Sequence, residues 1–535
     1  MTELTGADIV GRALAAAGAT HAFGIPGGEV LALMAGLDRA GLRFVLVKHE
    51  NSGGFMAEGL WHMTGALPVL VATLGPGVAN AVNVIANAMQ DRVPMIFLTG
   101  CVDATEAETY THQVFDHQAM LRPVVKGTIR LAAGAVGAGI ARAIALAVSG
   151  QPGPVHVDVP IGVAEALSGE PPFAPHPPPE PGLPPEAALQ AARAILAGAQ
   201  HPLAIAGVDA VNEGAGPAIA AFCRDHGIPL ITTYKGKGLM PEDDPWCLGG
   251  AGLSPRADKL LLPLIGQADA ILLLGYDPIE MRIGWRNVFG PAQKVIEIAA
   301  MPRLHGMHRV DLALQGGLAA TLAALKQDAP ARWPGHEPEL ARDALQAAFA
   351  GPAHWGPHAV FRTIRAAMPP ETVVTADSGA HRILVSQIWG CPAPRHMLQS
   401  SGLCTMACSV PLAAGAALGR PEVPVVAFVG DAGLEMGAGE LATLRDLGVP
   451  VIICVLVDAS LTLIEMKQRA SQRANLGVDF GATDFPAVAR AFGGHGAWVD
   501  DVDGLNLELA AALTRADRFT LIAARIGRRA YDGAF

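Results

Sequence analysis

The stretch PVVAFVGDAGLEMGAGELATLRDLGVPVIICVLVD (residues 424–458) decides the fold of this chain. It opens with an apolar run, continues through a helical pattern and closes with a second apolar run rich in Val and Ile. Continuous β-branched runs indicate strands buried on both faces, and a helix between two such strands is typical of a parallel β-α-β unit. The stretch therefore predicts a parallel sheet covered by helices.

Each of the two predicted strands ends at an aspartate, Asp431 or Asp458. Adjacent parallel strands bring their carboxyl ends to the same edge of a sheet, so we expect the two carboxylates side by side. Carboxylate and carbonyl oxygens suit Mg²⁺, which commonly bridges to phosphate groups. A single aspartate at a strand end is often a solvated turn or a helix cap, but the paired spacing favours a metal site.

Similar apolar runs alternate with helical patterns along the whole chain. They are FVLVK (44–48), PVLVAT (68–73) and PMIFLTG (94–100), then PLAIAG and AILLLG, then TVVTAD before the stretch above. The proline-rich segment 168–186 and a weaker boundary near 327–357, which surrounds a short amphipathic helix, separate them into blocks. We predict an α/β protein with three domains, at 1–167, 187–326 and 355–535, each a mainly parallel sheet flanked by helices.

Composition excludes several classes of protein. The chain has 535 residues, is 51% hydrophobic and carries a net charge of −11, without the basic patch that nucleic acid requires. Its seven cysteines are scattered without paired C-x-x-C spacing, which favours a reduced, cytoplasmic protein with no zinc site. No stretch has the features of a signal peptide or a membrane span. We therefore expect neither nucleic acid nor a membrane as a partner.

Around the two aspartates the sequence resembles thiamine diphosphate (ThDP)-dependent 2-ketoacid decarboxylases and carboligases. The signature of that family is Gly-Asp-Gly followed after this interval by Asn, whereas this chain has Gly430-Asp431-Ala432 and Asp458. The resemblance implies ThDP and Mg²⁺ as cofactors, with Asp431, Asp458 and the backbone carbonyl of Ser460 as metal ligands. The two departures keep oxygen ligation open but add a negative charge and a methyl group.

The run DSGAHRIL (377–384) resembles another strand-end loop of the same family. The resemblance implies that Gly379, Ala380 and His381 contact the diphosphate. A plain turn with an exposed histidine is the alternative.

The segment SSGLCTMACSVPLAAGAALG (400–419) is similar to the family's Gly-Leu-Gly-Thr-Met-Gly segment. This implies that Met406 lies beneath the cofactor and that the backbone of Cys404 meets the pyrimidine amino group, although a Met among small residues is ordinarily core filling. The cofactor-binding set implied by the resemblance is Gly379, Ala380, His381, Cys404, Met406, Gly430, Asp431, Ala432, Gly433, Asp458, Ser460 and Leu461.

In the first block, Glu50 follows the predicted strand and opens NSGGFMAEGLWHMTG. A lone glutamate there is usually a surface residue. ThDP chemistry, however, needs a carboxyl group in an apolar pocket beside the aminopyrimidine, where it exchanges a proton. The family supplies a glutamate in a similar His-Glu context, and the match extends through residues 73–100. The resemblance therefore implies that Glu50 is catalytic.

The residues expected at the substrate pocket are less diagnostic. The loop GIPGGEVL, with Gly27 and Gly28, resembles the acetohydroxyacid synthase and pyruvate oxidase branches. In THQVFDHQAML, Gln113 falls on the Gln of the synthases' Phe-Gln-Glu and His112 on its Phe, so both are catalytic candidates. A partly buried structural role is an equal alternative for His112.

The segment 460–493 resembles catabolic acetolactate synthases, which implies that Leu461, Ile464 and Glu465 face the acyl pocket. By the same resemblance the three blocks are pyrimidine-binding, central Rossmann-like and diphosphate-binding domains. Some relatives hold FAD in the central domain and others leave it empty, so FAD stays open and is not predicted. The family architecture implies a homodimer or homotetramer with active sites between subunits.

The resemblance to the acetolactate (acetohydroxyacid) synthase branch predicts ThDP- and Mg²⁺-dependent decarboxylation of a pyruvate-like 2-ketoacid with carboligation to a second carbonyl. The alternatives are a decarboxylase that releases an aldehyde, an acyloin lyase or carboligase, and a non-catalytic homologue. Ala432 and Asp458 favour the last reading, and the retention of Glu50 argues against it.

Overall fold

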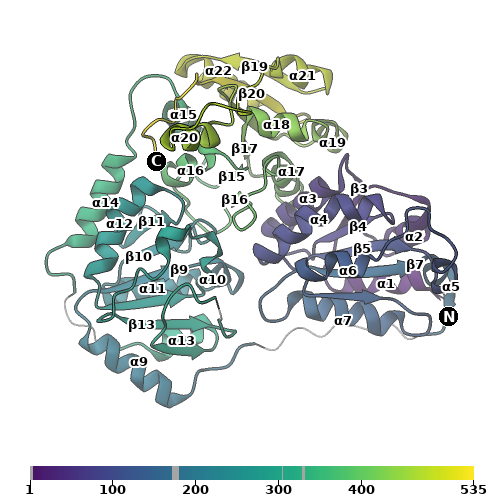
Figure 1. Cartoon of the computed structure of the whole chain (residues 1–535), viewed down its shortest axis with the longest axis horizontal. Helices are drawn as coiled ribbons and strands as arrows, with labels where there is room; N and C mark the ends of the chain where they lie inside the picture. The colour runs from purple at the N-terminus through teal and green to yellow at the C-terminus, as the bar shows by residue number, and fades with distance from the viewer. Residues whose placement is uncertain (1–3, 171–179, 304, 328–331) are drawn as a thin grey trace.

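The computed structural model describes residues 4–170, 180–303, 305–327 and 332–535, and it contains three six-stranded sheets (Figure 1). Every strand pair within these three sheets is parallel. Helices flank each sheet, and the sheets form three lobes in chain order from right to lower left to top in Figure 1. The α/β class with three parallel sheets is confirmed.

The first sheet has the order β3-β2-β4-β5-β7-β6. Its strands are β2 (His21–Gly24), β3 (Arg43–Leu46), β4 (Val69–Ala72), β5 (Ile96–Cys101), β6 (Gly127–Arg130) and β7 (Val155–Pro160). Its helices are α1 (Gly6–Ala16), α2 (Leu31–Arg39), α3 (Glu50–Thr64), α4 (Pro76–Gln90), α5 (Ala104–Ala107), α6 (His117–Leu121), α7 (Val136–Val148) and α8 (Ile161–Glu165). A separate antiparallel pair joins β1 (Leu4–Thr5) to β8 (Leu167–Ser168).

The middle sheet has the order β11-β10-β9-β12-β13-β14. Its strands are β9 (Pro202–Ala206), β10 (Leu230–Thr233), β11 (Cys247–Ala251), β12 (Ala270–Leu274), β13 (Lys294–Ala299) and β14 (Leu312–Gln315). Its helices are α9 (Glu186–Gly198), α10 (Val208–Asn212), α11 (Gly216–His226), α12 (Pro255–Gln267) and α13 (Leu318–Ala324).

The third sheet has the order β16-β15-β17-β18-β20-β19. Its strands are β15 (Val373–Ala376), β16 (Met397–Gln399), β17 (Val425–Gly430), β18 (Ile452–Val457), β19 (His495–Val499) and β20 (Thr520–Arg525). Its helices are α15 (Pro357–Ala367), α16 (Ala380–Ile388), α17 (Ser409–Gly419), α18 (Asp431–Gly437), α19 (Glu440–Leu447), α20 (Thr462–Ala470), α21 (Phe485–Ala491) and α22 (Val502–Ala512).

All of the apolar runs predicted as strands form strands, and most are buried on both faces, whereas β3 lies at the edge of its sheet and leaves Leu46 51% exposed. The amphipathic helix predicted between the second and third blocks is α14 (Glu337–Ala348). Of the proline-rich segment 168–186, residues 171–179 lie outside the described residues. Within the described ranges, no helix combines the length and apolarity needed to cross a bilayer. All seven cysteines are free.

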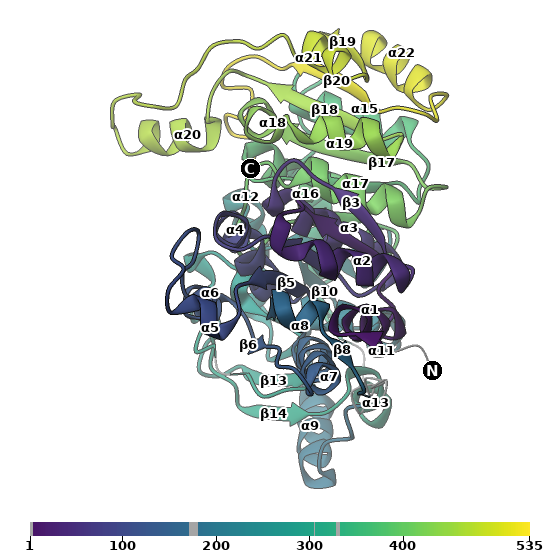
Figure 2. The same ribbon diagram turned by 90° about the vertical axis from the view of Figure 1, so that its right-hand side faces the viewer.

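Helices α3 and α17 form the main contact between the first and third blocks, and both views place them side by side (Figures 1 and 2). A Cβ atom at Gly59 would lie 2.2 Å from the backbone oxygen of Leu412, and one at Gly415 would lie 2.0 Å from that of Met56. Only glycine permits so close an approach of two helices. This crossing fixes the first block against the third within one chain.

Replacing Gly415 with Ala should lower the urea midpoint of unfolding by an amount equivalent to about 1–3 kcal/mol, because the new methyl group forces the two helices apart. The matched control is Gly198→Ala on α9, where an added Cβ would meet no atom within 4 Å. Equal midpoints for the two variants would contradict this account of the helix crossing.

Candidate functional site

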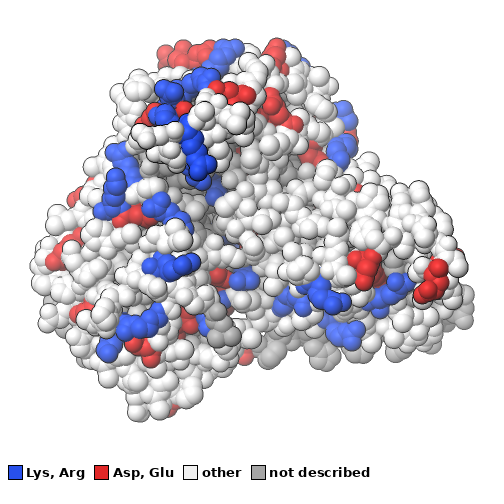
Figure 3. Space-filling view, in the orientation of Figure 1, with Lys and Arg blue, Asp and Glu red and all other residues white. Residues whose placement is uncertain are grey.

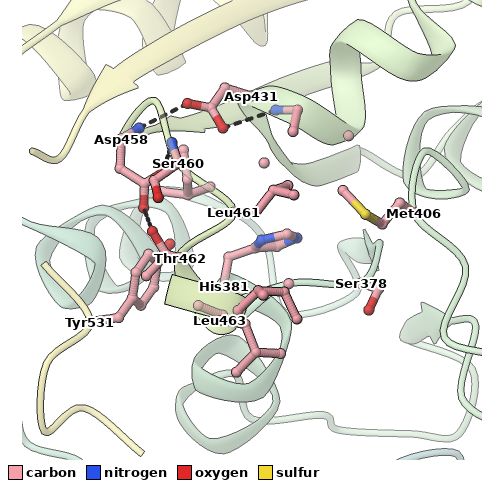
Figure 4. Close-up of a pocket in the computed structure, with 17 residues that line it drawn as sticks. Ser378, His381, Met406, Asp431, Asp458, Ser460, Leu461, Thr462, Leu463 and Tyr531 are labelled. Carbon is pink, nitrogen blue, oxygen red and sulfur yellow. Dashed lines mark hydrogen bonds between the residues drawn. The ribbon is translucent and has the colours of Figure 1, made fainter. Parts of the chain in front are cut away.

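One cavity lies at the carboxyl edge of the third sheet, beyond the ends of β15, β17 and β18 (Figure 4). It is lined by Ser378, Gly379, Ala380, His381, Met406, Gly430, Asp431, Ala432, Gly433, Leu456, Asp458, Ser460, Leu461, Thr462, Leu463, Ile464 and Tyr531. Most residues predicted to contact a cofactor are therefore brought to a single cavity. Leu456, Thr462, Leu463 and Tyr531 had no signal in the sequence.

The predicted pairing of the two aspartates is present. Strands β17 and β18 are adjacent and in register, with Gly430 opposite Leu456, so both carboxyl ends reach the same edge. Asp431 Oδ2 accepts hydrogen bonds from the backbone N–H groups of Asp458 (3.0 Å) and Ala459 (2.7 Å), as drawn in part in Figure 4. Its Oδ1 accepts from the N–H of Ala432 at 2.9 Å. Burial raises the pKa of Asp431, although these N–H bonds act against it.

Asp458 is held in the same way, by its own loop. Its Oδ1 accepts from the N–H of Ser460 at 3.3 Å, and its Oδ2 accepts from the hydroxyl of Thr462. Burial, together with the negative charge of Asp431 and against the Thr462 hydrogen bond, raises the pKa of Asp458 to about 7. Burial opposes the ionisation of both carboxyl groups, and the charge of Asp431 further opposes that of Asp458, so a divalent cation would stabilise the pair. The residues present fit Mg²⁺.

The rest of the cavity fits a diphosphate. His381 is 4% exposed, so the alternative of a turn with an exposed histidine is wrong. Its Nε2 contacts Asp377 Oδ1 at 2.8 Å, which fixes the ring beside Gly379 and Gly430. The hydroxyl of Tyr531 is buried in the lining and has no hydrogen-bond partner among the described residues. A buried, unsatisfied hydroxyl indicates a polar ligand.

The loop that carries Met406 has a glycine-like backbone at two residues that are not glycine. Met406 lines the cavity across from Asp458 (Figure 4), whereas Cys404 lies outside the lining. Cys404 and Ala407 have φ angles of +55° and +63°, the left-handed region that favours glycine. The thiol of Cys404 is fixed by Arg382, whose Nη2 donates to Sγ at 3.1 Å. The contact expected for the backbone of Cys404 stays a prediction.

Glu50 lies apart from this cavity. It is the first residue of α3 and 4% exposed, and its Oε2 accepts from Nδ2 of Asn80 on α4 at 3.0 Å. Because Glu50 is buried, the alternative that it is a surface residue is wrong. Among the described residues, none from the first block lines the third-block cavity. A single chain therefore separates Glu50 from the aspartate pair.

Gly27 and Gln113 lie beside the turn that precedes α4, residues 73–75, and Glu50 lies beside Gly77 in the first turn of α4. A Cβ at Gly27 would lie 2.2 Å from Thr73 Oγ1, and a Cβ at Gly75 would lie 2.5 Å from the backbone oxygen of Gln113. Gly28 faces open space. His112 is exposed, so the alternative of a partly buried structural histidine is wrong for that residue.

The residues predicted to face the acyl pocket lie at the start of α20, and only two of the three line the cavity. Leu461 and Ile464 line the cavity, and Ile464 keeps 44% of its surface exposed. Glu465 does not line it, contrary to the expectation from the sequence. Its carboxylate instead binds Arg469, with Nε to Oε1 at 3.1 Å and Nη2 to Oε2 at 3.0 Å, because the arginine lies one helical turn further along.

Five residues beyond His112, a second histidine forms a buried network that the sequence did not reveal. His117 Nδ1 lies 2.9 Å from Asp158 Oδ1, and the hydroxyl of Thr99 donates to the same oxygen at 2.8 Å. His156 Nε2 lies 2.8 Å from the Thr99 hydroxyl oxygen. The N–H of Gly75 donates to His117 Nε2 at 3.2 Å. The network thus reaches the loop beside Glu50.

His117, His156 and Asp158 have potential metal-ligand atoms within 4.8 Å of one another. The same hydrogen bonds decide whether these atoms are free to bind a metal. Because His117 Nε2 accepts from Gly75, its Nδ1 carries the proton and donates to Asp158, which leaves no lone pair there for a metal. Burial alone would raise the pKa of Asp158, but hydrogen bonds from His117 and His156 outweigh it and hold the pKa well below its usual range.

Replacing His117 with Ala should lower the free energy of unfolding by about 1–3 kcal/mol, since Asp158 and the N–H of Gly75 each lose a buried partner. The matched control, His112→Ala, should change it by less than about 0.5 kcal/mol because His112 is exposed. The difference should be present at pH 7 and shrink as the pH falls below about 4, since the network holds Asp158 ionised. Urea titrations at several pH values measure both effects, and identical curves for the two variants would contradict the network.

Family models for thiamine pyrophosphate enzymes match three parts of the chain; thiamine pyrophosphate is another name for ThDP. The N-terminal TPP binding domain matches residues 4–120, the central domain residues 189–325 and the C-terminal TPP binding domain residues 377–524. The two TPP-binding models thus cover the loop around Glu50 and the third-block cavity.

Curated relatives match over nearly the whole length. The chain is 28% identical to acetolactate synthase of Bacillus subtilis, over 94% of this chain and 89% of that protein. It is 29% identical to the large subunit of acetolactate synthase isozyme 2 of Escherichia coli, over 95% and 93%. It is also 31% identical to a Pseudomonas aeruginosa protein named "Probable 2-ketoarginine decarboxylase", over 95% and 92%.

Proposed function

The chain belongs to the thiamine pyrophosphate enzyme family, and from this premise we propose that it decarboxylates a pyruvate-like 2-ketoacid and joins the remaining fragment to a second carbonyl compound. The observation that carries the proposal is the buried pair Asp431 and Asp458 at one edge of the third sheet, in the cavity that the C-terminal model covers. When bound, ThDP supplies the electron sink for the carbanion that loss of CO₂ leaves.

We assign the binding of the cofactors to residues of the third block. Asp431, Asp458 and the backbone carbonyl of Ser460 hold Mg²⁺, because they offer oxygen ligands at one edge. The diphosphate lies against the small residues of the two strand-end loops, which are Gly379, Ala380, Gly430, Ala432 and Gly433, with His381 and Leu461 beside it. Met406 supports the cofactor from the opposite wall.

Glu50 holds and exchanges the proton of the aminopyrimidine. The amide of Asn80 donates to its Oε2 and orients the carboxyl group, and burial between α3 and α4 keeps water away from it. Gln113 and Gly27 lie around the same loop and so belong to the substrate side of this carboxyl group. Exposed His112 is available to a reacting group that approaches this edge.

The walls of the cavity favour a donor 2-ketoacid whose side chain is small and apolar. Leu461, Leu463 and Ile464 line one side, and the acids of the lining are the two that we assign to the metal. A substrate with a guanidinium group would need a further carboxylate, and Glu465 is already paired with Arg469. Release of an aldehyde is the second candidate, favoured by the 31% identity to the protein named as a 2-ketoarginine decarboxylase.

Incubation of the purified protein with ThDP, Mg²⁺ and pyruvate should yield acetolactate, detected by NMR. Glu50→Gln should abolish product formation and leave ThDP binding largely intact, because only the proton exchange is lost. Acetaldehyde would favour the second candidate. No consumption of pyruvate, 2-ketoarginine or other 2-ketoacids, despite measured ThDP binding, would overturn the proposal.

We further propose that each active site is completed by a second copy of the chain. The family's two TPP-binding domains contain Glu50 and the aspartate pair, respectively. The close crossing of α3 and α17 nevertheless keeps these residues apart within one chain. In a dimer with a two-fold axis, Glu50 of each copy would reach the cavity of the other copy, which gives two equivalent sites.

Mixing the inactive variants Glu50→Gln and Asp431→Ala, followed by subunit exchange, should restore about a quarter of wild-type activity, because each mixed dimer has one site with both residues intact. The readout is product formation, with size-exclusion chromatography to confirm exchange. Each variant mixed with itself is the control. Persistent inactivity of the mixed dimers would place both residues in one chain and exclude the shared site.

A further inference from the structure

A second cavity of about 450 Å³ lies between the middle and third blocks and shares no residue with the cofactor cavity. Its walls come from the edge strand β11, the connecting helix α14, helix α15 and the end of α16. In Figure 3, Lys and Arg side chains gather on the side of the molecule where these two blocks meet. The family models and the proposed reaction give this cavity no role.

The charge of the lining is strongly positive although the chain is acidic overall. The lining contains Lys237, Arg342, Arg362 and Arg365 against one carboxylate, Glu242. Lys237 neutralises that carboxylate, with Nζ at 2.7 and 2.8 Å from its two oxygens. Three guanidinium groups remain without an acid in the lining.

The guanidinium groups are held in place by uncharged groups. Arg365 Nη2 donates to the carbonyls of Met368 (2.9 Å) and Pro369 (2.6 Å), and its guanidinium lies 4.6 Å from the centre of the Trp389 ring. Its Nη1 is buried and has no hydrogen-bond partner among the described residues. Stacking and the two carbonyls orient the group, while the free N–H bonds need an acceptor.

The other two arginines are each held by a single carbonyl. Arg362 Nη2 donates to Phe349 O at 3.2 Å, and Arg342 Nη1 donates to Pro245 O at 2.8 Å. Over the described part of the chain, neither Arg362 nor Arg365 forms an ion pair, and the acid nearest Arg342 is the exposed Asp343 at 3.9 Å. Each guanidinium therefore keeps donors for a ligand.

We propose that this cavity binds a small polyanion of the phosphate class, either a free phosphate compound or a nucleoside phosphate. Arginine presents a planar fork of donors that matches phosphate oxygens, and three of them neutralise a multiply charged group. The apolar residues Leu248, Leu345, Phe349 and Ile388 offer a wall for a ring. The volume is within the range of small-molecule sites.

The test uses full-length protein saturated with ThDP and Mg²⁺, so that the cofactor site is already occupied. Isothermal titration with inorganic pyrophosphate and with adenosine triphosphate should give saturable binding that weakens as NaCl is raised. Arg362→Gln combined with Arg342→Gln should weaken it at least about tenfold, since each loses charge-assisted hydrogen bonds. These two residues are chosen because each side chain forms a single hydrogen bond, to one backbone carbonyl, so its replacement should disturb the fold little.

The matched control is Arg142→Gln, an exposed arginine on α7. Unchanged affinity in this control, with unchanged ThDP affinity in all variants, supports the site. Tighter binding of the nucleotide than of pyrophosphate assigns a nucleoside phosphate, and the reverse assigns a free phosphate compound. Absence of saturable binding to wild-type protein, or an equal loss in Arg142→Gln, would overturn the proposal.

Discussion

The burial of two carboxylates at the ends of adjacent strands is the constraint on which the rest of the site depends. Asp431 and Asp458 lie on one edge because β17 and β18 pair in parallel register. Burying one charge is expensive and burying two side by side is more so, which the pKa of about 7 at Asp458 reflects. The N–H groups around Asp431 repay only part of this cost. The Mg²⁺ that we propose at this site would offset the rest of the cost.

A second constraint acts between blocks. The glycine contacts at Gly59 and Gly415 fix α3 on α17, so the first block cannot turn Glu50 toward the cavity of its own chain without losing this packing. The turn before α4, residues 73–75, is tied to the same block by the hydrogen bond from the N–H of Gly75 to His117 Nε2, and Gln113 lies beside it. Because Glu50 and the aspartate pair are held on separate blocks, the catalytic role that we propose for Glu50 requires the cavity of a second copy.

The sequence predicted what depends on local pattern and missed what depends on long-range packing. Strands such as β17 and β18 were predictable because continuous β-branched runs have few alternatives, and the aspartate pair followed from their connection. His112 and His117 look alike in sequence, and only the fold shows that the second meets Asp158 from another strand. Tyr531 is likewise brought to the cavity by the path of the C-terminal segment. The basic cavity joins residues from 237 to 390, a grouping that no spacing encodes.

The departures from the family's glycine pattern bear on whether the protein is an enzyme or a non-catalytic homologue. Cys404 and Ala407 keep the left-handed backbone that glycine normally supplies, and Ala432 keeps its N–H on Asp431 despite its methyl group. Each left-handed residue costs about 1–2 kcal/mol, a cost that a chain free of functional demands would relax. The loop shape is therefore maintained against local preference. The same reasoning applies to Glu50, which is buried with a single amide donor where an apolar residue would pack without cost. The strained backbone at Cys404 and Ala407 and the buried carboxyl group of Glu50 both favour an active enzyme.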